Sequence, residues 1–110
     1  MTFPRIAAFV AFALIASGSW AKDNIEAGKA KAAQACAACH SADGSKPIAP
    51  DQPILAGQHY DYLVRALQDY KAGRRSNPIM KGMAEPLSAQ EIRDLSAWFA
   101  SQPSPLKSAR

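Results

Sequence analysis

The segment Cys36-Ala-Ala-Cys39-His40 is the feature that most constrains this chain, because it holds both cysteines and one of the two histidines. Ile25, Ala32 and Cys36 recur at helical spacing in the alanine-rich stretch before it, so the segment closes a predicted helix. Two cysteines three residues apart, followed at once by a histidine, therefore lie on about one helical turn. This clustering favours a single ligand or cofactor that all three side chains share.

Three familiar cysteine sites account poorly for the segment. A thioredoxin-type dithiol follows a strand at a helix N-terminus, and no strand pattern precedes Cys36. A structural zinc ion needs four well-spaced ligands; the chain adds only His59, and the adjacent Cys39 and His40 diverge. A disulfide is compatible with an oxidising compartment, but it would close a very small loop and give His40 no role.

The remaining interpretation uses every residue, because C-x-x-C-H is the attachment pattern of c-type haem. Sulfurs one helical turn apart match the separation of the two haem vinyl groups, and the next residue projects its imidazole toward the iron. The sequence therefore predicts one covalently bound haem c, held by Cys36 and Cys39, with His40 as an axial ligand. The second axial ligand is expected to be Met80 or Met83, the two methionines of the chain after residue 21. A thioether ligand would raise the reduction potential.

The N-terminus has the layout of a secretory signal. A short basic start up to Arg5 precedes an apolar run over Ile6–Ala16, and Ser19 and Ala21 supply small residues before a cleavage site. The apolar run has 11 residues, too few for an ordinary membrane span. We expect residues 1–21 to be removed and 22–110 to form one exported monohaem domain without a stable membrane span; an uncleaved anchor is the alternative.

The exported part has helical patterns only. Helices are predicted from Ile25 to Cys36, from Gln58 to Ala72 and from Ser88 to about Gln102. Two proline- and glycine-containing stretches separate them, over 41–57 and 73–86, and both are predicted to be loops. The fold class is therefore all-α, with three main helices and long loops wrapped around one haem.

Several residues predict how these helices begin, end and pack. Asp23 or Asn24 is expected to cap the first helix, Gly73 to end the second, and Ser88 with Glu91 to form a capping box. Gly28 marks either a close crossing of two backbones or a tolerated surface position. We expect the helix faces to be buried at Tyr60, Leu63, Leu67, Tyr70, Ile92, Leu95 and Phe99.

The formal net charge of +4 is modest and is spread along the chain without a run of like charge. It lacks the dense basic stripe with interleaved aromatics that is typical of nucleic-acid binding, so no nucleic-acid partner is expected. A weakly cationic rim facing an acidic redox partner is the most that the charge supports. The candidate rim residues are Lys29, Lys31, Lys46, Arg74, Arg75 and Lys81.

Three blocks of sequence resemble the class I c-type cytochromes: AGKAKAAQACAACHSADG, LAGQHYDYLVRALQDYKAGRR and NPIMKGMAEPLSAQEIRDLSAWFASQ. They occur in the family's order over Ile25 to Gln102 and are most similar to short bacterial monohaem cytochromes c and to single domains of dihaem periplasmic cytochromes c. The resemblance implies the small cytochrome c fold. It also implies Met80 as the sixth ligand, with Met83 lining the haem pocket.

The resemblance implies further roles for individual residues. The first and last helices are expected to cross at Gly28, with Trp98 in a position where tyrosine is common. A proline carbonyl is expected to orient His40, with Pro50 favoured over Pro47 and Pro53. Arg74 and Arg75 are expected either to pair with the haem propionates or to be solvated. Asn77 is a candidate to support the methionine sulfur.

The function that the resemblance implies is a periplasmic, soluble, monomeric one-electron carrier with His/Met-ligated haem, rather than an enzyme. Redox proteins that donate and accept the electron are the expected partners. A cytochrome subunit of an exported dehydrogenase or oxidase is the alternative. A ligand-binding or catalytic haem protein is less favoured, because the sequence shows no distal histidine or cluster of acids and bases.

Overall fold

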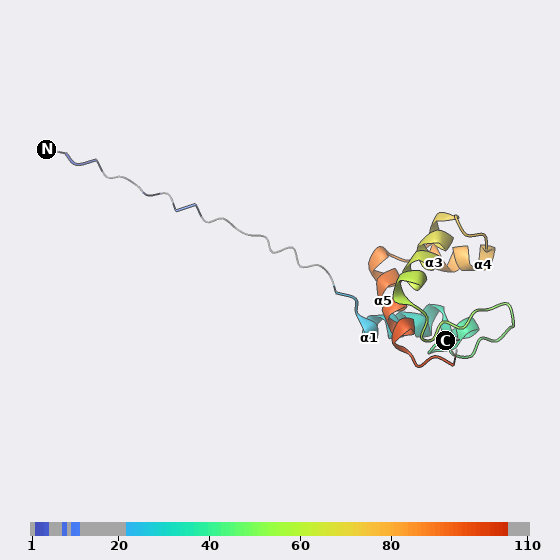
Figure 1. Cartoon of the computed structure of the whole chain (residues 1–110). Coiled ribbons are helices and arrows are strands. Elements are labelled where there is room, and N and C mark those ends of the chain that lie inside the picture. Colours follow the sequence, from blue (N-terminus) through green and yellow to red (C-terminus); the bar gives the residue numbers. More distant parts are fainter. Residues whose placement is uncertain (1, 5–7, 9, 12–21, 106–110) are drawn as a thin grey trace.

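The computed structural model describes residues 2–4, 8, 10–11 and 22–105. The predicted signal segment, 1–21, lies mostly outside these residues. Figure 1 shows the helices gathered in one body at the C-terminal side of residue 22, and no strand occurs in the described part. In chain order the helices are α1 (Ile25–Ala35), α2 (Ala37–His40), α3 (Tyr60–Ala72), α4 (Pro78–Ala84) and α5 (Ala89–Ser101).

The prediction of an all-α fold with three main helices, α1, α3 and α5, is confirmed. The prediction that 73–86 is a loop is wrong, because α4 occupies Pro78–Ala84. Pro78 and Gly82 count as helix breakers in a sequence pattern, but proline is favoured in the first turn of a helix, where its missing N–H is not needed. The Asn77 side chain accepts from the N–H groups of Ile79 and Met80 and so starts the helix.

Helices α1 and α5 cross in direct backbone contact at Gly28. This glycine is buried, and a methyl group in its place would lie 2.0 Å from the Asp94 carbonyl oxygen and 3.0 Å from the Trp98 Cβ. Asn24 caps α1 by accepting from the Ala27 N–H, and its own N–H donates to the buried Asp94 carboxylate at 2.8 Å. The close crossing and the cap are therefore as predicted, with Asn24 rather than Asp23 in the capping position.

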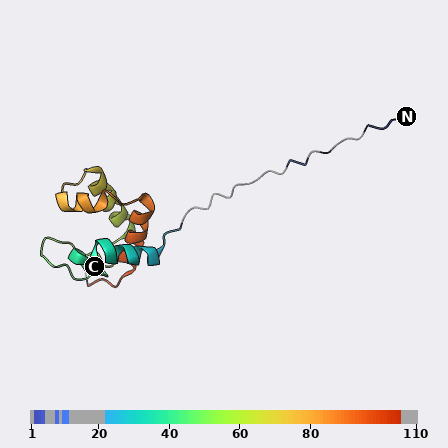
Figure 2. The same cartoon turned by 180° about the vertical axis from the view of Figure 1, so that it is seen from behind.

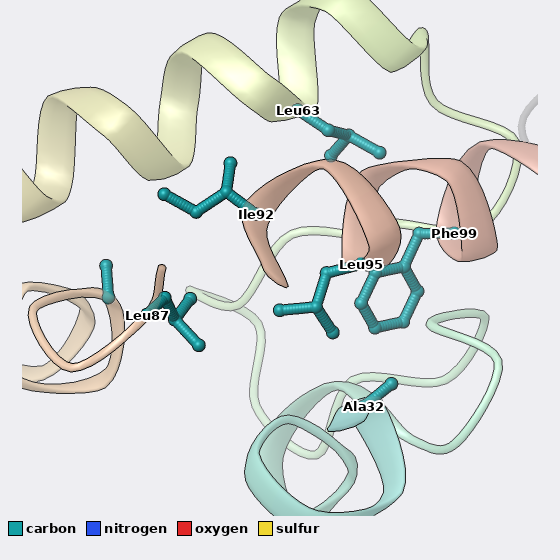
Figure 3. Close-up of a cluster of buried hydrophobic side chains, with 7 residues drawn as sticks. Ala32, Leu63, Leu87, Ile92, Leu95 and Phe99 are labelled. Atoms are coloured by element: carbon teal, nitrogen blue, oxygen red, sulfur yellow. The ribbon is translucent and has the colours of Figure 1, made fainter. Parts of the chain in front are cut away.

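Helix α5 carries the centre of the core. Ser88 and Glu91 form the predicted capping box, which fixes where the helix begins. Ile92, Leu95 and Phe99 follow at helical spacing and are buried. Figure 3 shows their side chains between α3 and α1, in contact with the cluster that is completed by Ala32, Leu63, Ala84 and Leu87.

Helix α3 packs on α5 and on α4. Leu63 is its buried contact, and Leu67 and Tyr70 are half-buried against the same cluster. Gly73 ends the helix in the left-handed region at φ 77°, where glycine carries no side-chain penalty. His59 precedes the first turn and is exposed.

The loop between α2 and α3 is fastened to the C-terminal end of α5. The Gly57 N–H donates to the Phe99 carbonyl at 2.9 Å, and Gly44 packs so closely that a methyl group there would lie 2.8 Å from the Phe99 ring. Both glycines have positive φ, 75° at Gly44 and 72° at Gly57. Figures 1 and 2 both show α4 and the 37–57 segment on the same side of α5, one above the other.

Within the described residues, no helix has the length and apolar character needed to span a bilayer.

Candidate haem-binding site

The Cys36–His40 segment forms a short helical turn that continues α1 with a change of direction. Cys36 is the hinge, with φ −115° and ψ −29°, and its N–H still donates to the Ala32 carbonyl. The His40 N–H donates to the Cys36 carbonyl at 3.0 Å, which closes the turn. Both cysteines are half-buried and neither is disulfide bonded.

The surroundings of Cys36 disfavour its thiolate form. Burial raises the pKa of the Cys36 thiol to about 11, against an ordinary value of 9.0, and the nearby Lys31 offsets this only partly. A redox dithiol or a zinc site needs thiolates, which burial of this kind opposes. Within the residues that the structure describes, no cluster of three or more metal-ligating side chains occurs. The cysteines therefore fit attachment as neutral thioethers better than either alternative.

His40 is held in one orientation by a backbone carbonyl. Its side chain is only 6% exposed, and its Nδ1 lies 3.1 Å from the Pro53 carbonyl oxygen. A carbonyl oxygen can only accept, so Nδ1 carries the proton and Nε2 keeps its lone pair for a metal. An orienting carbonyl of this kind fixes the tautomer of a ligand histidine and raises its basicity.

The proline that orients His40 is Pro53, so the expectation of Pro50 is wrong. The Gly44 carbonyl accepts from the N–H groups of Leu55 and Ala56, at 2.9 and 3.2 Å, and this contact brings the end of the loop back beside His40. Pro50 lies in an exposed turn closed by a hydrogen bond from the Gln52 N–H to the Ala49 carbonyl. Proline spacing alone does not reveal which carbonyl the folded loop returns.

The two candidate methionines lie three residues apart on α4. Met80 is half-buried, whereas Met83 is 49% exposed. Ala84, one turn after Met80, is fully buried in the core, and Ile79, one turn before Met83, is 71% exposed. The Asn77 Oδ1 accepts a 3.0 Å hydrogen bond from the Met80 N–H, so the side-chain oxygen of Asn77 fixes the first turn of the helix.

The two arginines named as candidate propionate partners both contact other side chains of the protein. Arg74 donates to the Asp69 carboxylate at 2.8 Å and lowers the pKa of that group. Arg75 donates to the Tyr62 hydroxyl at 3.3 Å and stacks over the Tyr70 ring, with its guanidinium carbon 4.9 Å from the ring centre. Arg74 uses its Nε and Arg75 one of its Nη groups in these bonds, so each guanidinium keeps further N–H donors.

Trp98 connects the helix crossing to the haem-binding segment. Its ring nitrogen donates to the Ala42 carbonyl at 3.0 Å, two residues after His40. Lys29 lies over the same ring, 5.5 Å from the ring centre. Tryptophan therefore supplies a hydrogen bond in the position where the family's tyrosine was expected. Trp98 lies four residues after Asp94 and therefore on the same side of α5 as the crossing.

With this geometry, the comparison with known proteins is decisive. Residues 25–103 match the model of the family described as Cytochrome c. The chain belongs to the cytochrome c family. Its members carry covalently bound haem c, and the Cys36, Cys39 and His40 arrangement fits that cofactor.

Relatives within the family include several cytochromes c4. Cytochrome c4 of Thiocapsa roseopersicina is 49% identical over 78 residues, covering 71% of this chain and 40% of that protein. The crystal structure of reduced recombinant cytochrome c4 from Pseudomonas stutzeri superposes with a TM-score of 0.70 at 41% identity, covering 77% of this chain and 48% of that chain.

A third relative carries a more specific name. The thiosulfate dehydrogenase electron acceptor of Stutzerimonas stutzeri strain A1501 is 40% identical over 80 residues, covering 73% of this chain and 37% of that protein. The chain thus spans less than half the length of these curated relatives. The match confirms the predicted family and fold for this single domain.

Proposed function

We propose that this cytochrome c domain is a one-electron carrier whose haem is bound through Cys36 and Cys39 and whose iron lies between His40 and Met80. The observation that carries the proposal is the state of His40. His40 is buried beside two cysteines that are not disulfide bonded. Its Nδ1–H donates to the Pro53 carbonyl, so the lone pair of Nε2 is the one left to bind a metal.

The cysteines make the attachment permanent. Cys36 and Cys39 would hold the haem as thioethers, each formed by addition of the whole S–H across one vinyl group, so the attachment would need no oxidant. Because the helical turn from Cys36 to His40 is closed by hydrogen bonds, the imidazole has a fixed position relative to both sulfurs. The haem supplies the iron couple that stores one electron.

The protein's contribution to transfer is rigidity around the ligand histidine. His40 is held by Pro53, and the Cys39 carbonyl accepts from the Ile48 N–H at 3.1 Å, so the turn and the loop move together. A ligand held in this way changes position little when the iron changes charge. The hydrogen bond at Nδ1 also raises the basicity of Nε2, which moderates the increase in potential that a thioether ligand gives.

Met80 is supported as the sixth ligand over Met83 by its position on α4. It lies on the half-buried side of the helix and one turn before the buried Ala84, and Asn77 fixes its backbone N–H. Met83 shares its side of the helix with the exposed Ile79. An iron closed by a methionine exchanges electrons without binding a substrate, so this assignment favours a carrier over an enzyme.

The partner proposed for this carrier is a redox protein with an acidic surface. Between Tyr70 and Ala84 the chain has four cations, Lys71, Arg74, Arg75 and Lys81, and no acidic residue, so positive charge is concentrated in this segment. The exposed Ile79 and Met83 lie within the same segment. An apolar centre with a cationic rim is typical of a transient docking surface. A relative named as the electron acceptor of thiosulfate dehydrogenase favours an exported dehydrogenase as one such partner.

The compartment belongs to the same proposal. Residues 1–21 are proposed to direct export and to be removed, and the domain over 22–110 is proposed to work as a monomer in the bacterial periplasm. N-terminal sequencing of protein purified from a periplasmic extract tests both points. A chain that begins at Met1 and stays with the membrane fraction would replace this proposal with an anchored cytochrome.

The haem proposal is tested by producing the protein in a host with working c-type maturation. The haem should stay on the polypeptide through acid–organic extraction, and the mass should increase by one haem. Replacing both Cys36 and Cys39 with Ala should make the haem extractable or leave an apoprotein, and because bound cofactor contributes folding free energy, that apoprotein should lack a cooperative thermal transition. A wild-type chain that matures without haem contradicts the proposal.

A further inference from the structure

The residue after His40 has an unusual backbone conformation. Ser41 has φ 69° and ψ 165°, and among the described residues it is the one non-glycine with positive φ. This part of conformational space is essentially reserved for glycine, and residues held there are found where the surroundings determine the backbone strongly. Something next to the predicted axial ligand therefore holds the chain against its own preference.

The Asp43 carboxylate is the centre of the contacts that hold this turn. Its Oδ1 accepts from the Ser45 hydroxyl at 2.6 Å, the Ser45 N–H at 2.9 Å and the Ser41 hydroxyl at 3.2 Å. The Ser41 hydroxyl oxygen also accepts from the Lys46 N–H at 3.0 Å. These hydrogen bonds, with that of the Ser45 hydroxyl first, lower the pKa of Asp43, so the carboxylate is charged at neutral pH.

The turn is connected to the carbonyl that orients His40. Gly44 lies inside it, and its carbonyl accepts from the N–H groups of Leu55 and Ala56, immediately after Pro53. The Pro53 carbonyl in turn accepts from His40 Nδ1. The path from Asp43 to the imidazole thus consists of two backbone contacts and one ring contact, all of which the structure records. No other acidic side chain is recorded in hydrogen bonds with this loop's described residues.

We propose that Asp43 is a positioning residue for His40: by fixing the strained Ser41 turn, it holds Gly44 and hence the Pro53 carbonyl against the Nδ1–H of the ligand histidine. The inference depends on the proposed function only in taking His40 as the axial ligand. Asp43 does not contact the imidazole, so its effect is on the strength and lifetime of the His40–Pro53 hydrogen bond.

The test uses the holoprotein and compares Asp43→Ala with Asp43→Asn. Asparagine keeps an Oδ1 acceptor but removes the charge, whereas alanine removes both. The primary readout is the solvent exchange of the His40 ring N–H, observed by NMR. We expect exchange to become about two- to tenfold faster in Asp43→Ala, the factor that corresponds to the net contribution of one hydrogen bond, and to change by a clearly smaller factor in Asp43→Asn.

The reduction potential provides a second readout. A weaker His40–Pro53 hydrogen bond makes the imidazole a poorer donor to ferric iron, so Asp43→Ala should raise the potential. Removing a negative charge would also raise it, but equally in Asp43→Asn and Asp43→Ala. Equal shifts in both variants, with unchanged ring N–H exchange, would overturn the positioning role and leave only a charge effect. Asp51→Ala, an exposed aspartate of the same loop, is the matched control and should change neither readout.

A second pair of variants separates strain from hydrogen bonding. Ser41→Gly and Ser41→Ala both remove the hydroxyl, but only glycine adopts φ 69° without penalty. We expect Ser41→Gly to keep slow ring N–H exchange and Ser41→Ala to accelerate it. Equal behaviour of the two would show that the backbone of Ser41 does not transmit the effect. If Asp43→Ala fails to mature, the same exchange measurement is made on Ser45→Ala. That variant removes only the 2.6 Å hydrogen bond from the Ser45 hydroxyl to Asp43, and it should also accelerate the exchange.

The outcome for the proposed function is read separately from the wild-type protein. A ring N–H of His40 that is not shifted by the paramagnetic ferric iron would mean that His40 is not the ligand, whatever the Asp43 variants do. A shifted N–H with identical exchange in the wild type and Asp43→Ala would leave the carrier intact and remove Asp43 from the positioning of His40.

Discussion

Gly28 and Asp94 bring the backbones of α1 and α5 into direct contact, and the space between them is too small for a methyl group. A Cβ at residue 28 would lie 2.0 Å from the Asp94 carbonyl oxygen and 2.5 Å from its carbon. Both are backbone atoms, so the clash cannot be relieved by a side-chain rotation. The two helices can approach this closely only because residue 28 has no side chain.

The first prediction follows from this contact. Gly28→Ala gains helix propensity but forces α1 and α5 apart, and overpacking of this kind costs about 1–3 kcal/mol. Gly82→Ala is the matched control. Gly82 lies inside α4, and apart from its chain neighbours and the backbone of its own helix no described atom lies within 4 Å of the added methyl group, so the substitution should stabilise the protein by about 0.5–1 kcal/mol. Thermal or denaturant unfolding of both holoproteins measures the difference. Stabilisation by both substitutions would contradict the close crossing.

Much of the fold could be predicted from the sequence because its signals are local. The capping box at Ser88 and Glu91, the glycine stop at Gly73 and the spacing of Ile92, Leu95 and Phe99 depend on residues that are neighbours in the chain, and the structure confirms each of them. Helix α4 was not predictable in this way. Its capping residue, Asn77, is followed by Pro78, and the pattern for a loop start is the same as the pattern for a capped helix.

The site shows the same division. The C-x-x-C-H segment is local and identifies the cofactor by itself, whereas the partners of His40 come from a loop that folds back on itself. Pro53 faces His40 because Gly44 accepts from the backbone of Leu55 and Ala56, a pairing that no spacing rule contains. Ser41 was equally hidden, since its strained backbone is a property of the folded turn and not of the residue type.

The second prediction concerns acid stability. The Lys31 ammonium, 2.8 Å from Glu91, and then the Ser88 N–H lower the pKa of the Glu91 carboxyl from its ordinary value of 4.5 to about 2. A group whose pKa is lowered on folding contributes stability above its unfolded pKa and loses it as pH falls through the folded pKa. This contribution should therefore be complete above pH 4.5 and disappear progressively toward pH 2.

The variants that test this are Glu91→Gln and Lys31→Met. Either should flatten the fall in unfolding free energy between pH 4.5 and pH 2, without abolishing it, because Asp43 and Asp69 also have lowered pKa values. Unfolding followed at several pH values in low salt gives the slopes. High salt should reduce the difference between the parent and the variants, since the pair is partly exposed. Parallel curves for all three proteins would show that the ion pair is not formed in solution.

The third prediction concerns the cationic segment around α4. Lys81 is the exposed cation of α4 itself, so Lys81→Glu reverses one of the four positive charges of the proposed docking surface. The rate of electron transfer to an acidic partner should fall by less than about tenfold, since steering accounts for about 10–10³ in total, and its dependence on ionic strength should weaken. Stopped-flow measurements over a range of salt concentrations provide both values.

Lys22→Glu is the control for that experiment. Lys22 is exposed before the start of α1, which Figure 1 shows at the opposite side of the body from α4, and the substitution changes the net charge by the same amount. It should leave the rate near that of the wild type. If the two substitutions slow transfer equally, then overall charge and not the α4 surface guides the partner.

The fourth prediction identifies the sixth ligand and thereby separates a carrier from a ligand-binding protein. If Met80 closes the iron, the ferric protein has the weak red-region absorption of an iron–thioether bond, and the ferrous protein binds carbon monoxide poorly at neutral pH. Met80→Ala should abolish that absorption, allow rapid carbon monoxide binding and lower the reduction potential, because ferrous iron loses its soft ligand.

Met83→Ala is the internal control, since Met83 lies on the same helix and is 49% exposed. It should keep the red-region absorption and change the unfolding free energy by no more than about 0.5 kcal/mol, as for most surface substitutions. The reverse pattern would assign the ligand to Met83, one turn further along α4. Rapid and complete carbon monoxide binding by the wild-type ferrous protein would mean an open sixth site. With an open site, the iron could bind and release a ligand as well as transfer an electron. The loop around His40 and helix α4 would then determine access to the iron, and the protein would be a ligand-binding or catalytic haem protein.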